Sequence, residues 1–114
     1  MDRVVIVKDG VLFTKIAPGG FRILEAITRT ARQVGFDLTI TSACDGEHSG
    51  PNDPHHRGEA YDVRSHDLSD AQKSQVLSSL VAQLSPGSFF FFLESPGTDN
   101  EHFHIQVKKG TVYP

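Results

Sequence analysis

Two histidine-containing clusters, far apart in the sequence, limit what this chain can fold into. The first runs from His55 to Asp62 and reads H-x-x-G-x-A-x-D, and the second is Glu101-His102-Phe103-His104. Four of the six histidines fall between His48 and His66, and the other two lie in the second cluster. Scattered surface histidines would not gather in this way, so we expect a fold that brings the two clusters together.

The residue types of the two clusters are those of an open zinc site. Catalytic zinc usually takes three protein ligands and leaves its fourth position to water. We predict that His55, Asp62 and His104 bind one Zn²⁺ ion per chain, because imidazoles with one carboxylate suit zinc better than magnesium or calcium. The small residues Gly58 and Ala60 are expected to let the backbone turn closely around the metal.

The length and composition describe a small globular protein. A chain of 114 residues is one domain, 1–114, and we expect it to be a monomer. A hydrophobic fraction of 38% and a charged fraction of 22% fit a folded chain. The net charge of −3 gives no basic surface for nucleic acid. The single cysteine, Cys44, allows no internal disulfide and is read as a small buried hydrophobe.

Hydrophobic patterning predicts three elements in the first part of the chain. An Asp-Gly pair lies between the mainly β-branched run 3–7 and the mostly apolar run 11–14, which is a strong signal for a hairpin. Apolar residues recur at helical spacing from Phe21 to Val34, and Gly35 is placed to end that helix. Residues 36–40 alternate between apolar and polar, as in a half-buried strand.

The second part of the chain predicts a strand, a helix and two more strands. Residues 58–63 read as a strand, and Ser69 with Gln72 forms a capping box that opens a helix. The predicted apolar stripe of this helix is Val76, Leu77, Leu80, Val81 and Leu84. Residues 88–93 form a continuous apolar strand expected at the centre of the sheet, and residues 102–108 alternate.

These elements predict an α+β fold in which two helices pack on one face of a mostly antiparallel sheet. Asp62 and His104 would then project from neighbouring strands. His55 would reach over from the end of the long polar loop 41–54. We therefore expect two of the three ligands to be held on the rigid sheet.

The two motifs resemble those of a known family. H-x-x-G-x-A-x-D followed by E-x-x-H is similar to the zinc D-alanyl-D-alanine carboxypeptidases and the L-alanyl-D-glutamate endopeptidases of phage endolysins. Locally, residues 41–49, 90–95 and 102–104 are closer to the hedgehog N-terminal signalling domain, which shares that fold and zinc site. The likeness runs roughly from Leu38 to Val107.

The resemblance implies roles for residues beyond the ligands. Glu101 matches the general base of the peptidase pattern, and Glu94 is the alternative that fits the hedgehog pattern. His48 would face the metal and stabilise an oxyanion. Arg64, on the same strand face as Asp62, is the cation expected to bind substrate.

The loop after the second predicted strand departs from the carboxypeptidase pattern. Asp45 stands where those enzymes carry a carboxylate-binding arginine. We therefore expect weak release of terminal D-alanine and faster cleavage inside a longer stem peptide. In hedgehog the corresponding acidic loop binds calcium, so Ca²⁺ at Asp45, Glu47 and Asp53 is a second, weaker metal prediction.

Two classes of function remain open at this point. The first is a zinc metallopeptidase that hydrolyses a short peptide, most simply one of the peptidoglycan stem. The second is a hedgehog-like interaction domain that binds zinc without catalysis. The N-terminal apolar run is too short for a signal peptide and no stretch is long enough to span a membrane. We expect synthesis in the cytoplasm, with the cell wall as the site of action in the first case.

Overall fold

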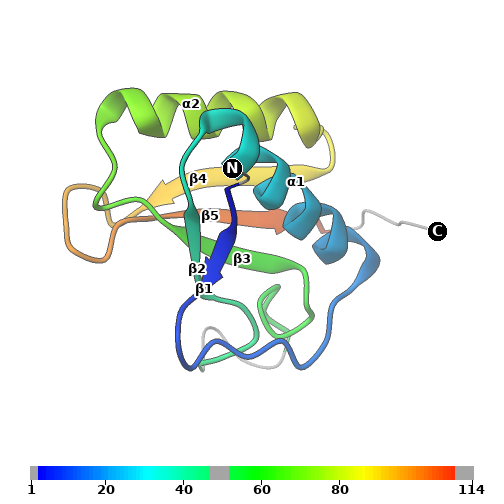
Figure 1. Cartoon of the computed structure of the whole chain (residues 1–114). Coiled ribbons are helices and arrows are strands. Elements are labelled where there is room, and N and C mark those ends of the chain that lie inside the picture. Colours follow the sequence, from blue (N-terminus) through cyan, green and yellow to red (C-terminus); the bar gives the residue numbers. More distant parts are fainter. Residues whose placement is uncertain (1–2, 47–51, 110–114) are drawn as a thin grey trace.

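Five strands form one sheet, and two helices lie on the same face of it (Figure 1). The computed structural model describes residues 3–46 and 52–109. In chain order the elements are β1 (Val5–Val7), α1 (Pro18–Val34), β2 (Leu38–Ser42), β3 (Ala60–Arg64), α2 (Asp70–Gln83), β4 (Phe89–Glu94) and β5 (His102–Val107). The predicted fold class is confirmed.

The centre of the sheet is the antiparallel pair of β3 and β5. The strand order is β1-β2-β3-β5-β4, and only β1 and β2 are parallel. Asp62 of β3 lies directly opposite His104 of β5. Because side chains alternate along a strand, Tyr61 and Val63 point into the core beneath the helices. Asp62 and His104 therefore lie on the face that carries no helix.

The first helix follows the predicted pattern. Proline at its first position suits a helix start, because the missing backbone N–H has no partner there. Its buried positions Ile23, Ile27 and Ala31 recur at helical spacing and join the core. Gly35 ends the helix with a left-handed φ of 84°, as predicted, and its N–H donates to the carbonyl of Ala31.

The second helix begins at the predicted capping box but has a narrower apolar stripe. The Ser69 side chain accepts from the Gln72 backbone, and the Gln72 side chain accepts from the Ser69 backbone. Three of the five predicted stripe residues, Val76, Leu80 and Leu84, are buried, whereas Leu77 and Val81 are exposed. Within the described residues, no helix is long and apolar enough to cross a membrane.

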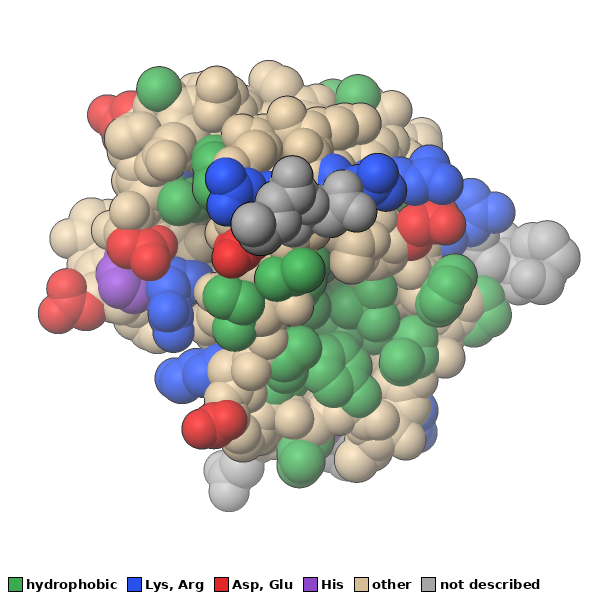
Figure 2. Space-filling model, viewed as in Figure 1, with side chains coloured by type: hydrophobic (Ala, Val, Ile, Leu, Met, Phe, Trp, Pro, Cys, Tyr) green, Lys and Arg blue, Asp and Glu red, His purple; other side chains and the backbone are tan. Residues whose placement is uncertain are grey.

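The predicted N-terminal hairpin is wrong. The strand β1 pairs in parallel with β2, with Val5 opposite Leu38. After the turn, the chain runs beside the end of β2 instead, where Cys44 donates its N–H to the carbonyl of Leu12 at 2.8 Å. Leu12 and Phe13 therefore stay 53% and 36% exposed. Figure 2 shows hydrophobic side chains gathered in the lower part of the face in view, where Figure 1 places the N-terminal segment.

The apolar strand β4 lies at the edge of the sheet, not at its centre as predicted. It pairs only with β5 in the strand order, and its outward-facing Phe90 and Phe92 remain 46% and 47% exposed. Phe92 lies over the ring of His104, with 4.9 Å between the ring centroids. Phe92 of this edge strand therefore borders the candidate site.

Two glycines allow the N-terminus of α1 to contact the chain just before β3. A Cβ atom added to Gly20 would stand 1.9 Å from the carbonyl oxygen of Gly58. Gly58 itself has φ +72°, and an added Cβ would lie 2.6 Å from the carbonyl oxygen of Lys15. Gly58 was expected to leave room for the metal. The structure corrects this expectation, because the room is needed for the helix and its preceding segment.

Replacing Gly20 with alanine is expected to destabilise the protein strongly. Glycine-to-alanine changes inside helices normally stabilise, but here the new methyl group would collide with backbone. We expect a loss of about 3 kcal/mol or more of unfolding free energy, at the upper end of overpacking effects. Urea denaturation measures it. The control is Gly87→Ala, whose Cβ would meet only a serine side chain at 3.4 Å; equal stability of the two variants would contradict this account.

Candidate metal centre

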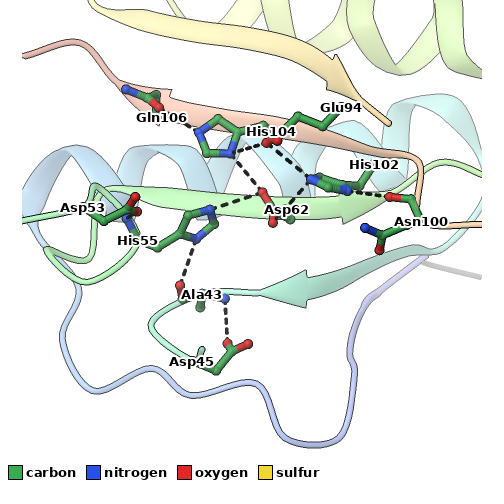
Figure 3. Close-up of polar contacts among 10 residues, drawn as sticks. All are labelled: Ala43, Asp45, Asp53, His55, Asp62, Glu94, Asn100, His102, His104 and Gln106. Atoms are coloured by element: carbon green, nitrogen blue, oxygen red, sulfur yellow. Dashed lines mark hydrogen bonds and ion pairs between the residues drawn. The ribbon is translucent and has the colours of Figure 1, made fainter. Parts of the chain in front are cut away.

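Three potential metal ligands from separate segments meet on the face of the sheet that carries no helix (Figure 3). Asp62 and His104 project from the paired strands β3 and β5. His55 comes from the loop before β3. All three are buried, with exposed fractions of 3% for His55 and 7% for Asp62 and His104. Their donor atoms lie within 4.8 Å of one another, so the group could hold a metal ion.

The distances between these donor atoms fit a metal centre. Oδ1 of Asp62 lies 3.3 Å from Nε2 of His55 and 3.0 Å from Nδ1 of His104. In a tetrahedral zinc site with bonds of 2.0–2.1 Å, neighbouring donors lie about 3.3 Å apart. Both distances from Asp62 are therefore compatible with a shared metal ion.

His55 is oriented by two loop contacts. Its Nδ1 lies 2.9 Å from the carbonyl oxygen of Ala43, which can only accept, so Nδ1 carries a proton. Nε2 is thereby left to face Asp62. The backbone N–H of His55 donates to Oδ1 of Asp53 at 2.9 Å, which fixes the loop. This pattern, in which the second ring nitrogen donates to a carbonyl, is typical of histidines that bind metals.

His104 is oriented in the same way by a neighbour on its own strand. Its Nε2 lies 2.7 Å from Oε1 of Gln106 and donates to it. Nδ1 is left to face Asp62 and the carboxylate of Glu94, at 3.0 Å and 3.1 Å. Gln106 lies in the strand whose alternation was predicted from the sequence, but it was given no role there. The alternating His-x-His-x-Gln pattern of the strand was the signal for it.

Charge around Asp62 favours its ionised form. Burial alone would raise the pKa of Asp62, but hydrogen bonds from His104 and His55 hold that pKa well below its usual value. Burial likewise lowers the pKa of His104, whereas its hydrogen bond to Asp62 raises it, and the net shift is upward. Asp62 is therefore an anion that draws positive charge to the centre, which a bound cation would satisfy.

A second potential ligand group adjoins the first and shares Asp62 with it. Nε2 of His102 lies 3.5 Å from Oδ2 of Asp62 and 3.4 Å from Oε1 of Glu94. These three residues form another set whose donors lie within 4.8 Å of one another. Nδ1 of His102 donates to the carbonyl of Asn100 at 2.7 Å. The sequence gave no sign that the Asn100 carbonyl would orient His102, because this contact depends on the shape of the turn.

An open pocket gives access to both groups. Its lining is Asp53, His55, Asp62, Phe92, Glu94, His102, His104 and Gln106. Of the two glutamates considered as a general base, Glu94 lines this pocket and Glu101 does not. The carboxylate of Glu94 is 40% exposed, so solvent and ligands can reach it.

The structure separates Glu101 from the ligands. Its carboxylate is buried, with Oε1 accepting from Lys73 Nζ at 2.8 Å and Ser65 Oγ at 2.9 Å, and Oε2 accepting from the Gly97 N–H at 3.0 Å. Residues three apart on an extended chain point to opposite faces, so E-x-x-H does not bring Glu101 beside His104 here. Glu101 thus ties α2 to the turn before β5 and does not line the metal pocket, and its role as the base stays a prediction.

This buried ion pair predicts an acid-sensitive contribution to stability. The hydrogen bond from Lys73 lowers the pKa of Glu101 from 4.5 to about 2. The contribution is therefore complete above pH 4.5 and disappears as the pH falls towards 2. We expect Lys73→Met to be less stable than the wild type at neutral pH, with the difference shrinking in that acid range. Urea denaturation across pH tests this, and a difference that is constant with pH would contradict it.

Arg64 and His48 are not part of the described centre. Arg64 lies opposite His102 in the sheet register and lines a neighbouring hollow together with Lys8 and His66. It shares a strand face with Asp62, as predicted, but it is adjacent to the metal pocket and does not line it. His48 lies outside the described residues, as does Glu47 of the acidic loop.

The remaining acidic loop residues hold the loop in place. Oδ1 of Asp45 accepts the N–H of Ala43 at 2.8 Å, and Asp53 caps His55 as described. Among the described residues, neither aspartate belongs to a group of three potential metal ligands. Calcium at this loop therefore gains no support from the described residues. Cys44 is half-buried and belongs to neither ligand group.

Comparison of the chain with protein-family models, curated proteins and solved structures gives no match. The chemistry of the centre is therefore inferred from the donor atoms of the chain itself. Two imidazoles and a carboxylate converge in an open pocket, with a second carboxylate and a third imidazole beside them.

Removing Gln106, the hydrogen-bond partner that orients the His104 ring, should weaken metal binding without removing a ligand. Gln106→Leu keeps the size of the side chain but leaves Nε2 of His104 without its acceptor. Loss of such a partner typically costs 10–100-fold in metal affinity. Competition with a chromogenic chelator measures the change. Gln106→Glu is the control, since it keeps an acceptor; unchanged affinity in Gln106→Leu would contradict the assigned role.

Proposed function

We propose that the chain is a zinc-dependent metallopeptidase and that His55, Asp62 and His104 are its metal ligands. The observation that supports this is the open trio of donors with both histidines already oriented by acceptors on their other ring nitrogens. A purely structural zinc site is usually closed by four protein ligands. Here the trio faces a pocket that also contains a reachable carboxylate.

The identity of the ion is argued from the donors. Imidazole nitrogens with one carboxylate oxygen suit zinc, whereas magnesium and calcium prefer oxygen ligands throughout. The donor spacing of 3.0–3.3 Å around Asp62 fits the edge of a zinc tetrahedron. When bound, zinc would polarise the scissile carbonyl and acidify a water molecule.

Glu94 is the general base in this proposal. Its carboxylate lies beside His104 and is exposed to the pocket, which is where an attacking water must stand. Glu94 accepts one proton from this water as the oxygen attacks the carbonyl carbon. It then delivers that proton to the leaving nitrogen as the C–N bond breaks. Water adds across one peptide bond to give a carboxylic acid and an amine, and the acid then passes its proton to the amine, which leaves a carboxylate and an ammonium group.

The substrate class is proposed from the motifs and the pocket. The resemblance to peptidases of the bacterial cell wall suggests the stem peptide of peptidoglycan. The metal pocket is lined by acidic and neutral groups besides its histidines, with Arg64 displaced to the next hollow. A free terminal carboxylate would find no arginine beside the metal. Internal cleavage of a longer peptide is therefore favoured over release of a terminal D-alanine.

A digestion experiment tests this function. Zinc-loaded protein is incubated with a purified muropeptide and, separately, with D-alanyl-D-alanine, and the products are followed by mass spectrometry. We expect cleavage of the muropeptide, faster than that of the dipeptide, and loss of cleavage with a zinc chelator. Tight zinc binding without any cleavage would instead favour the non-catalytic, hedgehog-like alternative.

A further inference from the structure

One imidazole of the pocket, that of His102, has no role in the proposed reaction. His102 is oriented like a ligand, because its Nδ1 donates to the Asn100 carbonyl and its Nε2 faces two carboxylates. His102 thus shares with His55 and His104 one ring nitrogen bonded to an acceptor and a second ring nitrogen that faces a carboxylate. Its side chain is only 14% exposed, so the arrangement is held by the surrounding structure.

The geometry around His102 matches that of the first ligand group. Nε2 of His102 lies 3.4 Å from Glu94 and 3.5 Å from Asp62, close to the roughly 3.3 Å between neighbouring donors on zinc. The contact with Asp62 is made by Oδ2, whereas His55 and His104 both contact Oδ1. Each oxygen of Asp62 therefore serves a different group, as in carboxylates that bridge two metal ions.

We propose that Asp62, Glu94 and His102 form a second zinc site, bridged to the first by Asp62, and that filling it inhibits the enzyme. The inhibition rests on the proposed function, whereas the second ion does not. Glu94 is more exposed than the ligands of the first group, at 40%, so water competes better for the second site and it binds more weakly. An ion held by Glu94 takes up the lone pairs with which this residue would accept a proton.

The second zinc ion therefore acts as an inhibitor, and the zinc concentration sets how much of the protein is inhibited. With about one equivalent of zinc the first group fills, and Glu94 remains a base. At higher zinc the second group fills, and the contribution of the base, typically 100-fold or more, is lost. Hydrolysis should rise and then fall as zinc is added.

Zinc binding to the metal-free full chain tests the inference directly. Isothermal titration with ZnCl₂, together with elemental analysis after gel filtration, counts the ions. The variants are His102→Ala and His102→Asn, and the control is His66→Ala, which removes an exposed histidine outside both groups. Circular dichroism checks that each is folded. Muropeptide hydrolysis is measured in parallel at stoichiometric and at excess zinc.

We expect about two zinc ions for the wild type and His66→Ala, bound in two phases, and about one for the His102 variants. Excess zinc should slow hydrolysis by the wild type but not by a folded His102 variant. Saturation of the wild type at one ion, or a second ion retained by both His102 variants, overturns the inference. Two ions bound with no hydrolysis would overturn the proposed peptidase and the inhibition, while the second site would stand.

Discussion

Asp62→Ala is expected to abolish metal binding. This carboxylate is the one group that contacts all three imidazoles of the pocket, at 3.0 Å for His104, 3.3 Å for His55 and 3.5 Å for His102. Its removal takes away the anion that His55 and His104 share, and the remaining Glu94 contacts His104 and His102 but lies outside the first ligand group. Because loss of an orienting partner alone costs 10–100-fold, we expect loss of this ligand to weaken zinc binding by more than about 100-fold.

Elemental analysis of the purified variant measures that loss. Asp67→Ala is the control, because Asp67 follows the same strand but is exposed and outside both ligand groups. Zinc should also raise the unfolding temperature of the control and not that of Asp62→Ala, since ligands stabilise only a state that binds them. Full zinc content in a folded Asp62→Ala protein would overturn the ligand assignment.

Glu94→Gln should separate metal binding from catalysis. The amide keeps the shape of the side chain but cannot accept a proton, so we expect hydrolysis to fall by about 10²–10⁴-fold. The first ligand group does not include Glu94, so about one zinc ion should remain. The loss should appear in kcat, because the proton transfer belongs to the reaction and not to substrate binding.

The matched comparison is Glu101→Gln. Its carboxylate is bound by Lys73 and Ser65 in the interior, so this variant should keep most of its activity. It should instead lower the unfolding temperature, because Lys73 would lose its ionised partner. An inactive Glu101→Gln beside an active Glu94→Gln would restore the role that the E-x-x-H spacing predicted.

The candidate ligands Asp62 and His104 could be placed on one face of the sheet from the sequence, because strand periodicity carries long-range information here. Asp62 and His104 each stand in an alternating pattern, so their faces could be assigned before any pairing was known. The capping box at Ser69 and the left-handed Gly35 were also local and correct. Only the meeting of β3 with β5 had to be supplied by the fold.

The wrong predictions share a physical cause, which is competition from distant partners. The turn after β1 looked like a hairpin, but the edge of β2 offered β1 a longer-range parallel partner. The strand β4 is apolar enough for the centre of a sheet, yet no further strand pairs with its outer edge in the described sheet. The expected position of Glu101 beside the ligands rested on its distance from His104 in sequence, which says nothing about Lys73 on the facing helix.

The register of β3 against β5 also sets the order of events during folding. Asp62 and His104 are 42 residues apart in the chain, and they become neighbours only when the central pair of strands closes. Until then the unfolded chain holds no preformed pair of ligands, and closing so long a loop costs entropy before any metal bond repays it. Zinc added during refolding should therefore leave the folding rate nearly unchanged and slow unfolding instead.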